Sequence, residues 1–352
     1  MRKRTLPVRP LRIAAATAAA LSLTAVAACG GTGGGSSSAD SVTVYSADGL
    51  GDWFTTQFKA FEDETGISVD YVEGGSGEVV SRADKEKSNP QMDVLVTLPP
   101  FIQQADEKGL IGDTRPAGID ALPAEAKADD GHYVTLADNY FTMIRGTRVS
   151  PEPTSWDDLL APRFAQRIQY STPGQAGDGT ALMLLVQHLY GEQGGLDYLT
   201  RLQANNVGPS ASTGKLGPKV GTGELSVANS DVQMALAAIK NDKAAYETFI
   251  PTGPHGERVT LSLPYAMAEA ADAPHGANAQ KLIDFLMSVD VQKTLADDAF
   301  GVSARTDVHA TGSNADAITA AVDGAQIWQP DWNDVNERFD ALVEAYGKAT
   351  GQ

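Results

Sequence analysis

The segment that indicates the fold is Asp93-Val-Leu-Val-Thr97, followed by Leu98-Pro-Pro100, by Phe101-Ile-Gln-Gln-Ala-Asp-Glu-Lys108 and by Gly109. Its first part is rich in β-branched residues and ends at a pair of prolines, which predicts a short buried strand. The part after the prolines predicts a helix that Gly109 ends. A strand, a tight loop and a helix in this order form the repeating unit of an α/β fold.

The same order occurs twice on the N-terminal side of this segment. Residues 42–46 and 68–72 predict strands, because each is rich in Val, Thr and Tyr and is bounded by turn residues. A helix is predicted after each strand, the first with aromatic residues at helical spacing from Trp53 to Phe61 and the second over 78–87. This alternation predicts a mainly parallel sheet with helices on both faces.

Ligands of such sheets bind beyond the C-terminal ends of the strands. Three loops occupy that position, at 46–51, 74–78 and 97–100, and all are rich in Gly, Ser, Thr or Pro. The binding candidates in these loops are Ser46, Asp48, Ser76, Gly77, Glu78 and Thr97.

A second candidate stretch is Ser171-Thr-Pro-Gly-Gln-Ala-Gly-Asp-Gly-Thr180, which precedes an apolar run of helical length. It predicts a tight loop leading into the N-terminus of a buried helix, where backbone N–H groups are unpaired and carry a positive partial charge. Gly179 and Thr180 would offer such groups to a small anion. An ordinary capped helix behind a surface loop is the alternative, as it is for the helix that Ser76 is expected to cap.

Four acidic residues fall in loops at the same level of the predicted sheets. Asp48 and Glu78 belong to the first half of the chain, and Asp178 and Asp231 to the second, where Ser230 could cap a helix. Acids are common on surfaces, so each alone carries little information. Beside two anion sites they would suit a ligand that also carries a cationic group. Glu78 is favoured as the partner of that group because it adjoins the first anion loop.

The charge of the chain limits its partners. The sequence has 352 residues, of which 27 are basic and 45 acidic, giving a net charge of −18. That balance disfavours binding to nucleic acid or to anionic lipid head groups. The five histidines are scattered without a metal-binding spacing and the sequence contains no P-loop pattern, so we expect no metal ion, no cofactor and no ATPase activity.

The N-terminus has the pattern of a secretory signal. Five basic residues precede an apolar run that ends at Val26-Ala-Ala-Cys29, and Cys29 is the single cysteine of the chain. This ending resembles the bacterial lipobox, in which the cysteine is lipidated and becomes the new N-terminus. We expect a lipoprotein signal peptide over 1–28 and a flexible Gly/Ser-rich tether over 29–40. A plain cleaved signal or a short membrane helix is the alternative.

The chain resembles the periplasmic-type solute-binding proteins of ABC importers, in the group that includes ferric-iron, polyamine, thiamine and phosphonate binders. More narrowly, it is similar to the members that bind 2-aminoethylphosphonate. The stretches that carry the resemblance are Val44–Leu50, Tyr71–Glu78, Lys85–Pro90, Asp93–Phe101, Ser171–Thr180 and Leu263–Tyr265, and Lys281–Ser288 with Gln292 resembles the wider group. Ferric binders usually place adjacent tyrosines near the return crossing, whereas Tyr265 stands alone here.

The resemblance implies an α/β fold of the two-lobed type II periplasmic-binding-protein kind, with a hinge of crossing strands and the ligand between the lobes. Residues 41–137 with 264–310 should form one lobe, and 138–263 with 311–352 the other. The protein would be a lipid-anchored monomer on the extracytoplasmic face of the cell membrane. It would deliver 2-aminoethylphosphonate to ABC permease subunits and catalyse no reaction, with Tyr265 adding a hydroxyl donor to the site.

An extracellular hydrolase of phosphonates or phosphoesters is the alternative from a different class. Gly74-Gly-Ser-Gly-Glu78 approaches the G-x-S-x-G nucleophile motif, but Glu78 stands where the last glycine belongs. The sequence supplies neither a nucleophile–base pair nor a metal cluster, which such a reaction requires. Binders of iron, a polyamine or phosphate are the alternatives within the solute-binding class.

Replacement of Cys29 by alanine should release the protein from membranes or block its processing, because the thiol is the group that would be lipidated. Fractionation of the cells and the size of the mature chain measure the two effects. A variant that stays with membranes and is processed like the parent would contradict the lipoprotein hypothesis.

Overall fold

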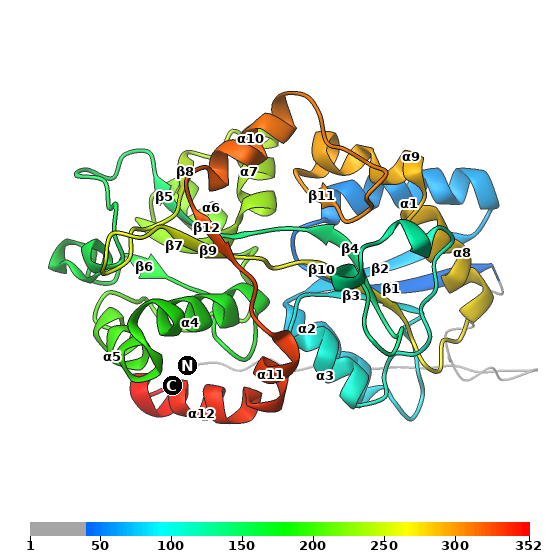
Figure 1. Ribbon diagram of the computed structural model, residues 1–352, viewed down its shortest axis with the longest axis horizontal. Coiled ribbons are helices and arrows are strands. Elements are labelled where there is room, and N and C mark those ends of the chain that lie inside the picture. Colours follow the sequence, from blue (N-terminus) through cyan, green and yellow to red (C-terminus); the bar gives the residue numbers. More distant parts are fainter. Residues whose placement is uncertain (1–39) are drawn as a thin grey trace, which may run out of the picture. The chain divides into compact units, whose positions relative to one another are not determined.

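The first lobe is built on a six-stranded sheet in the computed structural model, which describes residues 40–352 (Figure 1). Its strands are β1 (Ser41–Ala47), β2 (Ser68–Gly74), β3 (Val94–Thr97), β4 (Val134–Asp138), β10 (Tyr265–Glu269) and β11 (Val302–Ser303). They lie in the order β11-β4-β10-β3-β1-β2. The predicted signal peptide and all but the last residue of the predicted tether lie outside the described residues.

Helices cover both faces of this sheet. The face to which Val44 and Val96 point packs against α1 (Gly51–Thr65) and α8 (Gly276–Leu286). The face of Tyr45 and Leu95 packs against α2 (Ser76–Lys85) and α3 (Phe101–Glu107). Neighbouring residues of a strand point to opposite faces, so the largely buried strands β1 and β3 supply side chains to both layers.

The second lobe is built on a four-stranded sheet with the order β6-β7-β5-β8. Its strands are β5 (Phe141–Gly146), β6 (Ile168–Gln169), β7 (Val227–Asp231) and β8 (Tyr246–Phe249). The buried helix α4 (Gly177–Tyr190) packs on β5 and β7, and α5 (Glu192–Leu202) packs on α4. The helices α6 (Gly217–Thr222) and α7 (Val232–Asn241) pack with the apolar side chains of the opposite face, among them Ile144 and Ala228.

The C-terminal part of the chain contacts both lobes. The helix α10 packs on α7, α11 contacts α3, α12 packs on α5, and β12 pairs in parallel with β9. These elements are α10 (Ser313–Val322), α11 (Trp332–Glu337), α12 (Phe339–Thr350), β9 (Val259–Leu261) and β12 (Gln326–Trp328). The remaining short elements are α9 (Val289–Gln292), the π-helical turn η5 (Leu295–Ala299) and the 3₁₀ turns η1 (Ile119–Ala121), η2 (Ala124–Ala126), η3 (Asp157–Leu160) and η4 (Pro162–Phe164).

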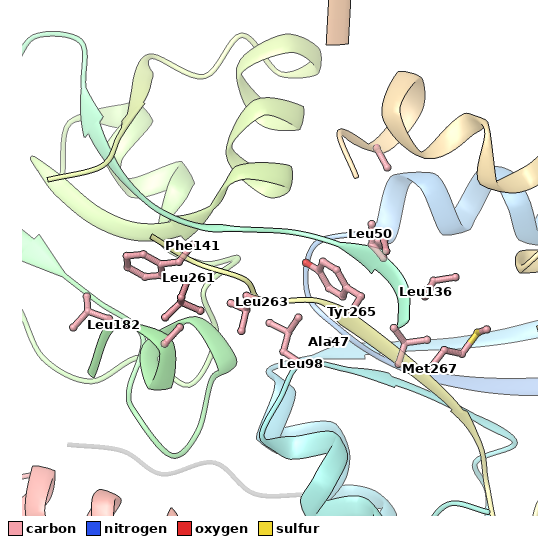
Figure 2. Packing of buried hydrophobic residues seen from close by; sticks show 14 of the residues in the cluster. Ala47, Leu50, Leu98, Leu136, Phe141, Leu182, Leu261, Leu263, Tyr265 and Met267 are labelled. Atoms are coloured by element: carbon pink, nitrogen blue, oxygen red, sulfur yellow. The ribbon is translucent and has the colours of Figure 1, made fainter. Parts of the chain in front are cut away.

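Two extended segments connect the main sheets of the two lobes. One leads from β4 through Asn139 and Tyr140 into β5, and the other leads from β9 through Leu263 into β10. Buried side chains continue along the crossing from Phe141 and Leu261 through Leu263 to Tyr265, as Figure 2 shows, so one hydrophobic cluster joins the lobes. The predicted two-lobed α/β fold with crossing strands is therefore confirmed.

The sheets are mixed, which corrects the prediction that they are mainly parallel. In the first sheet β1 is parallel to β2 and β3, but β10 is antiparallel to β3 and β4, and β11 is antiparallel to β4. In the second sheet β6 is parallel to β7, whereas β5 is antiparallel to β7 and β8. The reason is the crossing: β5 and β10 enter their lobes from the junction and therefore run against the strands that end there.

Asp93 connects three elements of the first lobe and predicts a test of its stability. The carboxylate has no exposed surface and accepts hydrogen bonds from the Thr43 N–H at 2.7 Å and the His275 N–H at 2.6 Å. Asp93→Ala leaves these donors without their acceptor and should lower the free energy of unfolding by about 3 kcal/mol. Denaturant unfolding measures the change. The exposed Asp70 of β2 is the control, since Asp70→Ala should change stability by less than about 0.5 kcal/mol. Equal effects of the two substitutions would contradict the role of Asp93.

Candidate ligand-binding site

The N-termini of α2 and α4 face each other where the lobes meet. The Gly77 N–H donates to the Gln175 carbonyl at 3.0 Å, and the Gly177 N–H donates to the Ser76 hydroxyl at 3.3 Å. A Cβ atom on Gly77 would lie 2.8 Å from the Gln175 oxygen, and one on Gly177 would lie 2.7 Å from side-chain carbons of Leu98. The two stretches predicted to bind an anion thus lie side by side, and only glycine fits at these two positions.

The start of α2 differs from the prediction. Gly75 is the N-cap, with an extended backbone, and Ser76 is the first helical residue, so Ser76 is not the cap. The exposed Glu78 turns back toward the start of the helix, with its carboxylate 3.4 Å from the Gly75 N–H. Glycine is an acceptable N-cap, and the sequence reasoning missed it because Ser76 is the stronger capping residue by type.

The helix α4 begins at Gly177, four residues earlier than predicted, so Gly179 and Thr180 lie in its first turn. The Thr180 hydroxyl donates to the Ala176 carbonyl at 3.0 Å and accepts from the Gly174 N–H at 3.1 Å. A Cβ atom on Gly179 would lie 2.1 Å from the Ser171 oxygen. Both residues therefore shape the loop before the helix. The Thr180 N–H donates to the Ala176 carbonyl at 3.0 Å, so it is not the unpaired donor that was predicted, whereas the role of Gly179 as an anion donor stays a prediction.

Two predicted hydroxyl donors lie buried at strand ends of the same junction. The Ser46 hydroxyl, at the end of β1, donates to the Ala47 carbonyl at 2.9 Å. The Thr97 hydroxyl, at the end of β3, donates to the Ser76 carbonyl at 3.2 Å. Both hydroxyls lie at strand ends, where binding residues were predicted. Each donates to a carbonyl of its own lobe in this structure.

Three aspartates gather at this junction, and we call them the aspartate cluster: Asp48, Asp178 and Asp231. Asp48 follows β1 of the first lobe, Asp178 lies in the first turn of α4, and Asp231 ends β7 of the second lobe. Asp178 and Asp231 are only 3% and 0% exposed. The side-chain oxygen Oδ1 of Asp178 is buried and has no hydrogen-bond partner among residues 40–352.

The other two members of the cluster have partners. Asp48 accepts from the Ser212 hydroxyl at 2.5 Å and the Gly214 N–H at 3.3 Å, both of the second lobe. Asp231 accepts from the Met234 N–H at 2.7 Å and is the N-cap of α7, which corrects the expectation that Ser230 caps this helix. Ser230 is buried beside it, and its hydroxyl donates to the Asp231 carbonyl.

Tyr265 lies between the two lobes at the start of β10 and has no exposed surface. Its hydroxyl donates to the Asp48 carbonyl at 2.9 Å and lies 3.4 Å from Oδ2 of Asp231 (Figure 2 shows the ring). Burial and the nearby aspartates raise the pKa of Tyr265 well above its ordinary value, so the hydroxyl stays a donor. The predicted donor role of Tyr265 thus has a place next to the aspartate cluster.

Burial disfavours the charged form of each carboxyl group in the aspartate cluster. Burial raises the pKa of Asp231 to about 6, and the charge of Asp48 adds to the effect. Burial and then the charge of Asp231 raise the pKa of Asp178 well above its ordinary value. Burial also raises the pKa of Asp48, although the hydrogen bond from Ser212 and the charge of Lys215 oppose it. Ionisation of the three carboxyl groups is therefore unfavourable without a cation.

Several residues of the junction were missed in the sequence. Gln233 donates through Nε2 to the carbonyls of Gly49 and Ala299, which lie in the first lobe, and Ser212 bonds Asp48. Ser212 lies in a stretch rich in Ser, Thr and Gly before Lys215, which is the only signal that could have found it. Gln233 lies in a helix pattern and gave no signal, because its role depends on the contact between lobes.

An open cavity of about 470 Å³ adjoins the cluster, and its lining includes Asp48, Glu73, Lys215 and Ser230. Within the described part of the chain, one set of acidic and histidine side chains brings its ligand atoms within 4.8 Å of one another. That set is Asp106, Asp130 and His132, on α3 and the loop before β4, and it includes no member of the aspartate cluster. The cluster is therefore spaced more widely than a metal centre.

Residues 89–338 match the family of bacterial extracellular solute-binding proteins, and the chain belongs to this family. Proteins of Salmonella paratyphi A and Salmonella typhimurium are each 44% identical to it over 315 residues, which cover 88% of this chain and 92% of theirs. Both carry the name 2-aminoethylphosphonate-binding periplasmic protein as a provisional assignment. The family serves ABC transport outside the cytoplasmic membrane by binding solutes, which confirms the prediction of a binding protein rather than an enzyme.

Solved structures confirm the type II periplasmic-binding-protein fold. A periplasmic binding protein of Actinobacillus pleuropneumoniae, solved with fructose-6-phosphate, has a TM-score of 0.75 at 19% identity and covers 88% of this chain and 99% of its own. A periplasmic thiamin binding protein has a TM-score of 0.73 at 18% identity, with coverages of 89% and 96%. Between residues 40 and 352, every helix is too short or too polar to cross a membrane.

The burial of Asp231 predicts how stability changes with pH. Its carboxyl group has an ordinary pKa of 3.8 in the unfolded chain and a pKa of about 6 in the folded protein. The stability that this group contributes is therefore complete below about pH 4 and is lost as the pH rises through about 6. Asp231→Asn cannot ionise and keeps an oxygen that can accept from Met234. The free energy of unfolding of the variant minus that of the parent should be about 2 kcal/mol larger at pH 7.5 than at pH 4.

Denaturant unfolding of the ligand-free protein at the two pH values measures this difference. Ser230→Ala is the control, because the neighbouring side chain does not titrate and its effect should be the same at both values. If the difference in the free energy of unfolding between Asp231→Asn and the parent does not change with pH, folding does not raise the pKa of Asp231.

Proposed function

We propose that this protein captures 2-aminoethylphosphonate between its lobes and delivers it to ABC permease subunits. The observation that carries the proposal is the aspartate cluster beside the facing N-termini of α2 and α4. A negative and a positive region that adjoin in this way match a zwitterion whose ammonium and phosphonate groups are joined by a short carbon chain. The provisional names of the Salmonella relatives, at 44% identity, support the same ligand.

The ammonium group is assigned to Asp178 and Asp231 rather than to Glu78. Both aspartates are buried, and Oδ1 of Asp178 has no hydrogen-bond partner among the described residues, whereas Glu78 is exposed and turned toward the Gly75 N–H. An ammonium group supplies three donors and a positive charge. It would favour the ionised carboxylates and so offset the cost of their burial.

The phosphonate group is assigned to the N-termini of α2 and α4. The donors there, the N–H groups of Gly77 and Gly177 among them, contact the opposite lobe in this structure. Capture would therefore require the lobes to separate about the crossing segments and to close again around the ligand. The phosphonate oxygens would then replace protein oxygens as acceptors, with the hydroxyls of Ser46, Thr97 and Tyr265 as further donors at the strand ends.

We also propose that the protein is a monomer anchored to the extracytoplasmic face of the cell membrane through a lipid on Cys29. The pattern of basic residues, apolar run and Cys29 supports the anchor, and the Gly/Ser-rich sequence up to residue 40 would leave the binding lobes free of the membrane surface. The periplasmic location in the names of the Salmonella relatives agrees with export.

Calorimetry with two ligands tests the proposed solute. The protein should bind 2-aminoethylphosphonate in the presence of a metal chelator, and ethylphosphonate, which lacks the amine, should bind more weakly by about 2–5 kcal/mol. Asp178→Asn should narrow this gap in binding free energy, because it removes one buried carboxylate that would bind the amine. Glu78→Gln is the matched control and should leave the gap unchanged.

Equal affinity of the parent protein for the two phosphonates would show that no carboxylate binds the amine. The assignment of the ammonium group to Asp178 and Asp231 would then be wrong. Tight binding of ferric iron, a polyamine or phosphate without a response to either phosphonate would favour that alternative solute. A gap that Glu78→Gln closes and Asp178→Asn does not would move the ammonium group to Glu78.

A further inference from the structure

The second lobe has a groove of about 500 Å³ whose lining includes three arginines, and we call it the arginine groove. Arg148 follows the end of β5, Arg163 lies in η4, and Arg167 precedes β6. The turn Gly221-Thr-Gly223 forms another part of the lining. β5 runs away from the junction of the lobes and β6 runs toward it, so the groove lies at the opposite end of the second sheet from the aspartate cluster.

The arginines of this groove have no acidic partners. Within residues 40–352, no carboxylate oxygen lies within 4.0 Å of a charged nitrogen of any of the three. Arg145 of β5 shows the contrast, since it forms ion pairs with Glu152 and Glu247. Apart from the five basic residues before Cys29, the chain has 22 basic and 45 acidic residues. A groove lined by three arginines and no acid is therefore a strong local departure from the charge of the protein.

Neutral groups hold two of the guanidinium groups in place. Arg167 donates through Nη2 to the Gly223 carbonyl at 2.9 Å and through Nε to the Ser226 hydroxyl at 3.3 Å. The guanidinium group of Arg163 lies over the Phe164 ring, 4.7 Å from its centre. These contacts use only part of the five N–H donors of each guanidinium group and neutralise none of the charge.

We propose that the arginine groove binds a phosphate group. Guanidinium groups match the oxygens of phosphate in a planar, two-pronged geometry, and three positive charges suit an anion of high charge. The same chemistry could come from a free phosphate or from the head group of an anionic phospholipid at the membrane to which the tether would hold the protein. The inference does not depend on which solute the cleft binds, because the groove shares no residue with the aspartate cluster.

Binding of pyrophosphate tests the groove itself. Calorimetry at low ionic strength should detect binding to the parent protein that weakens as salt is added. The double variant Arg148→Gln/Arg163→Gln should bind roughly 100-fold more weakly, since each lost charge-assisted contact is worth about tenfold or more. Arg145→Gln is the matched control, because Arg145 is already paired with acids, and it should bind like the parent. The cleft is unchanged in all three proteins, so the difference between them reports the groove.

Vesicles distinguish the two sources of phosphate. Sedimentation of the parent and the double variant with phosphatidylglycerol and with phosphatidylcholine vesicles compares a charged with a zwitterionic surface, and any lipid anchor contributes equally to each pair. Loss of pyrophosphate binding in the variant with no effect on vesicles supports a free phosphate. Loss of the preference for phosphatidylglycerol supports a head group. If the double variant has the melting temperature of the parent and neither probe separates the two proteins, the proposal is wrong.

Discussion

The arrangement of the site depends on one constraint, which is that the chain passes between the lobes in extended segments. A strand that arrives from the other lobe must run away from the junction, as β5 and β10 do. The strands antiparallel to them, β3 and β7, must then end at the junction, and β1 and β6 end there because they are parallel to these two. The loops and helix starts that follow the strand ends therefore converge from both lobes on one place.

This convergence places the positive ends of two helices next to three acidic groups. The starts of α2 and α4 carry positive partial charge, and Asp48, Asp178 and Asp231 lie in the same region, where a bound cation would favour their ionised forms. The burial of Asp231 is partly explained by its role as a helix cap, because the Met234 N–H donates to its carboxylate. Asp178 is not, since its Oδ1 has no hydrogen-bond partner in the described part of the chain. A buried carboxylate oxygen without a partner reduces stability, which is the usual property of a group retained for binding.

The aspartate cluster and the arginine groove differ in what surrounds them. Asp178 and Asp231 of the aspartate cluster are buried at the junction, where the exclusion of water strengthens every charge interaction. The arginine groove is open to solvent at the opposite end of the same sheet, with exposed side chains at Arg148, Arg163 and Arg167. Binding in the groove should therefore respond to salt more strongly than binding in the cleft.

The sequence by itself determined the elements and the class of fold. The apolar run of β3 and the aromatic spacing of α1 follow from local patterns, which a reader of the sequence can see. The resemblance in the loops indicated the family. The direction of β5 and β10 was not accessible in this way, because it depends on where the chain crosses and not on the residues of the strands.

Only the tertiary structure decided which candidate residues meet and which donors are already used. Asp48 and Ser212 are 164 residues apart in the chain, and nothing local to either predicts their hydrogen bond. The same holds for Gly77 and Gln175, and for the choice of Gly75 and Asp231 as helix caps over the adjacent serines. Helical and strand periodicity arise from neighbours along the chain, whereas burial and charge at the junction arise from segments that the fold alone brings together.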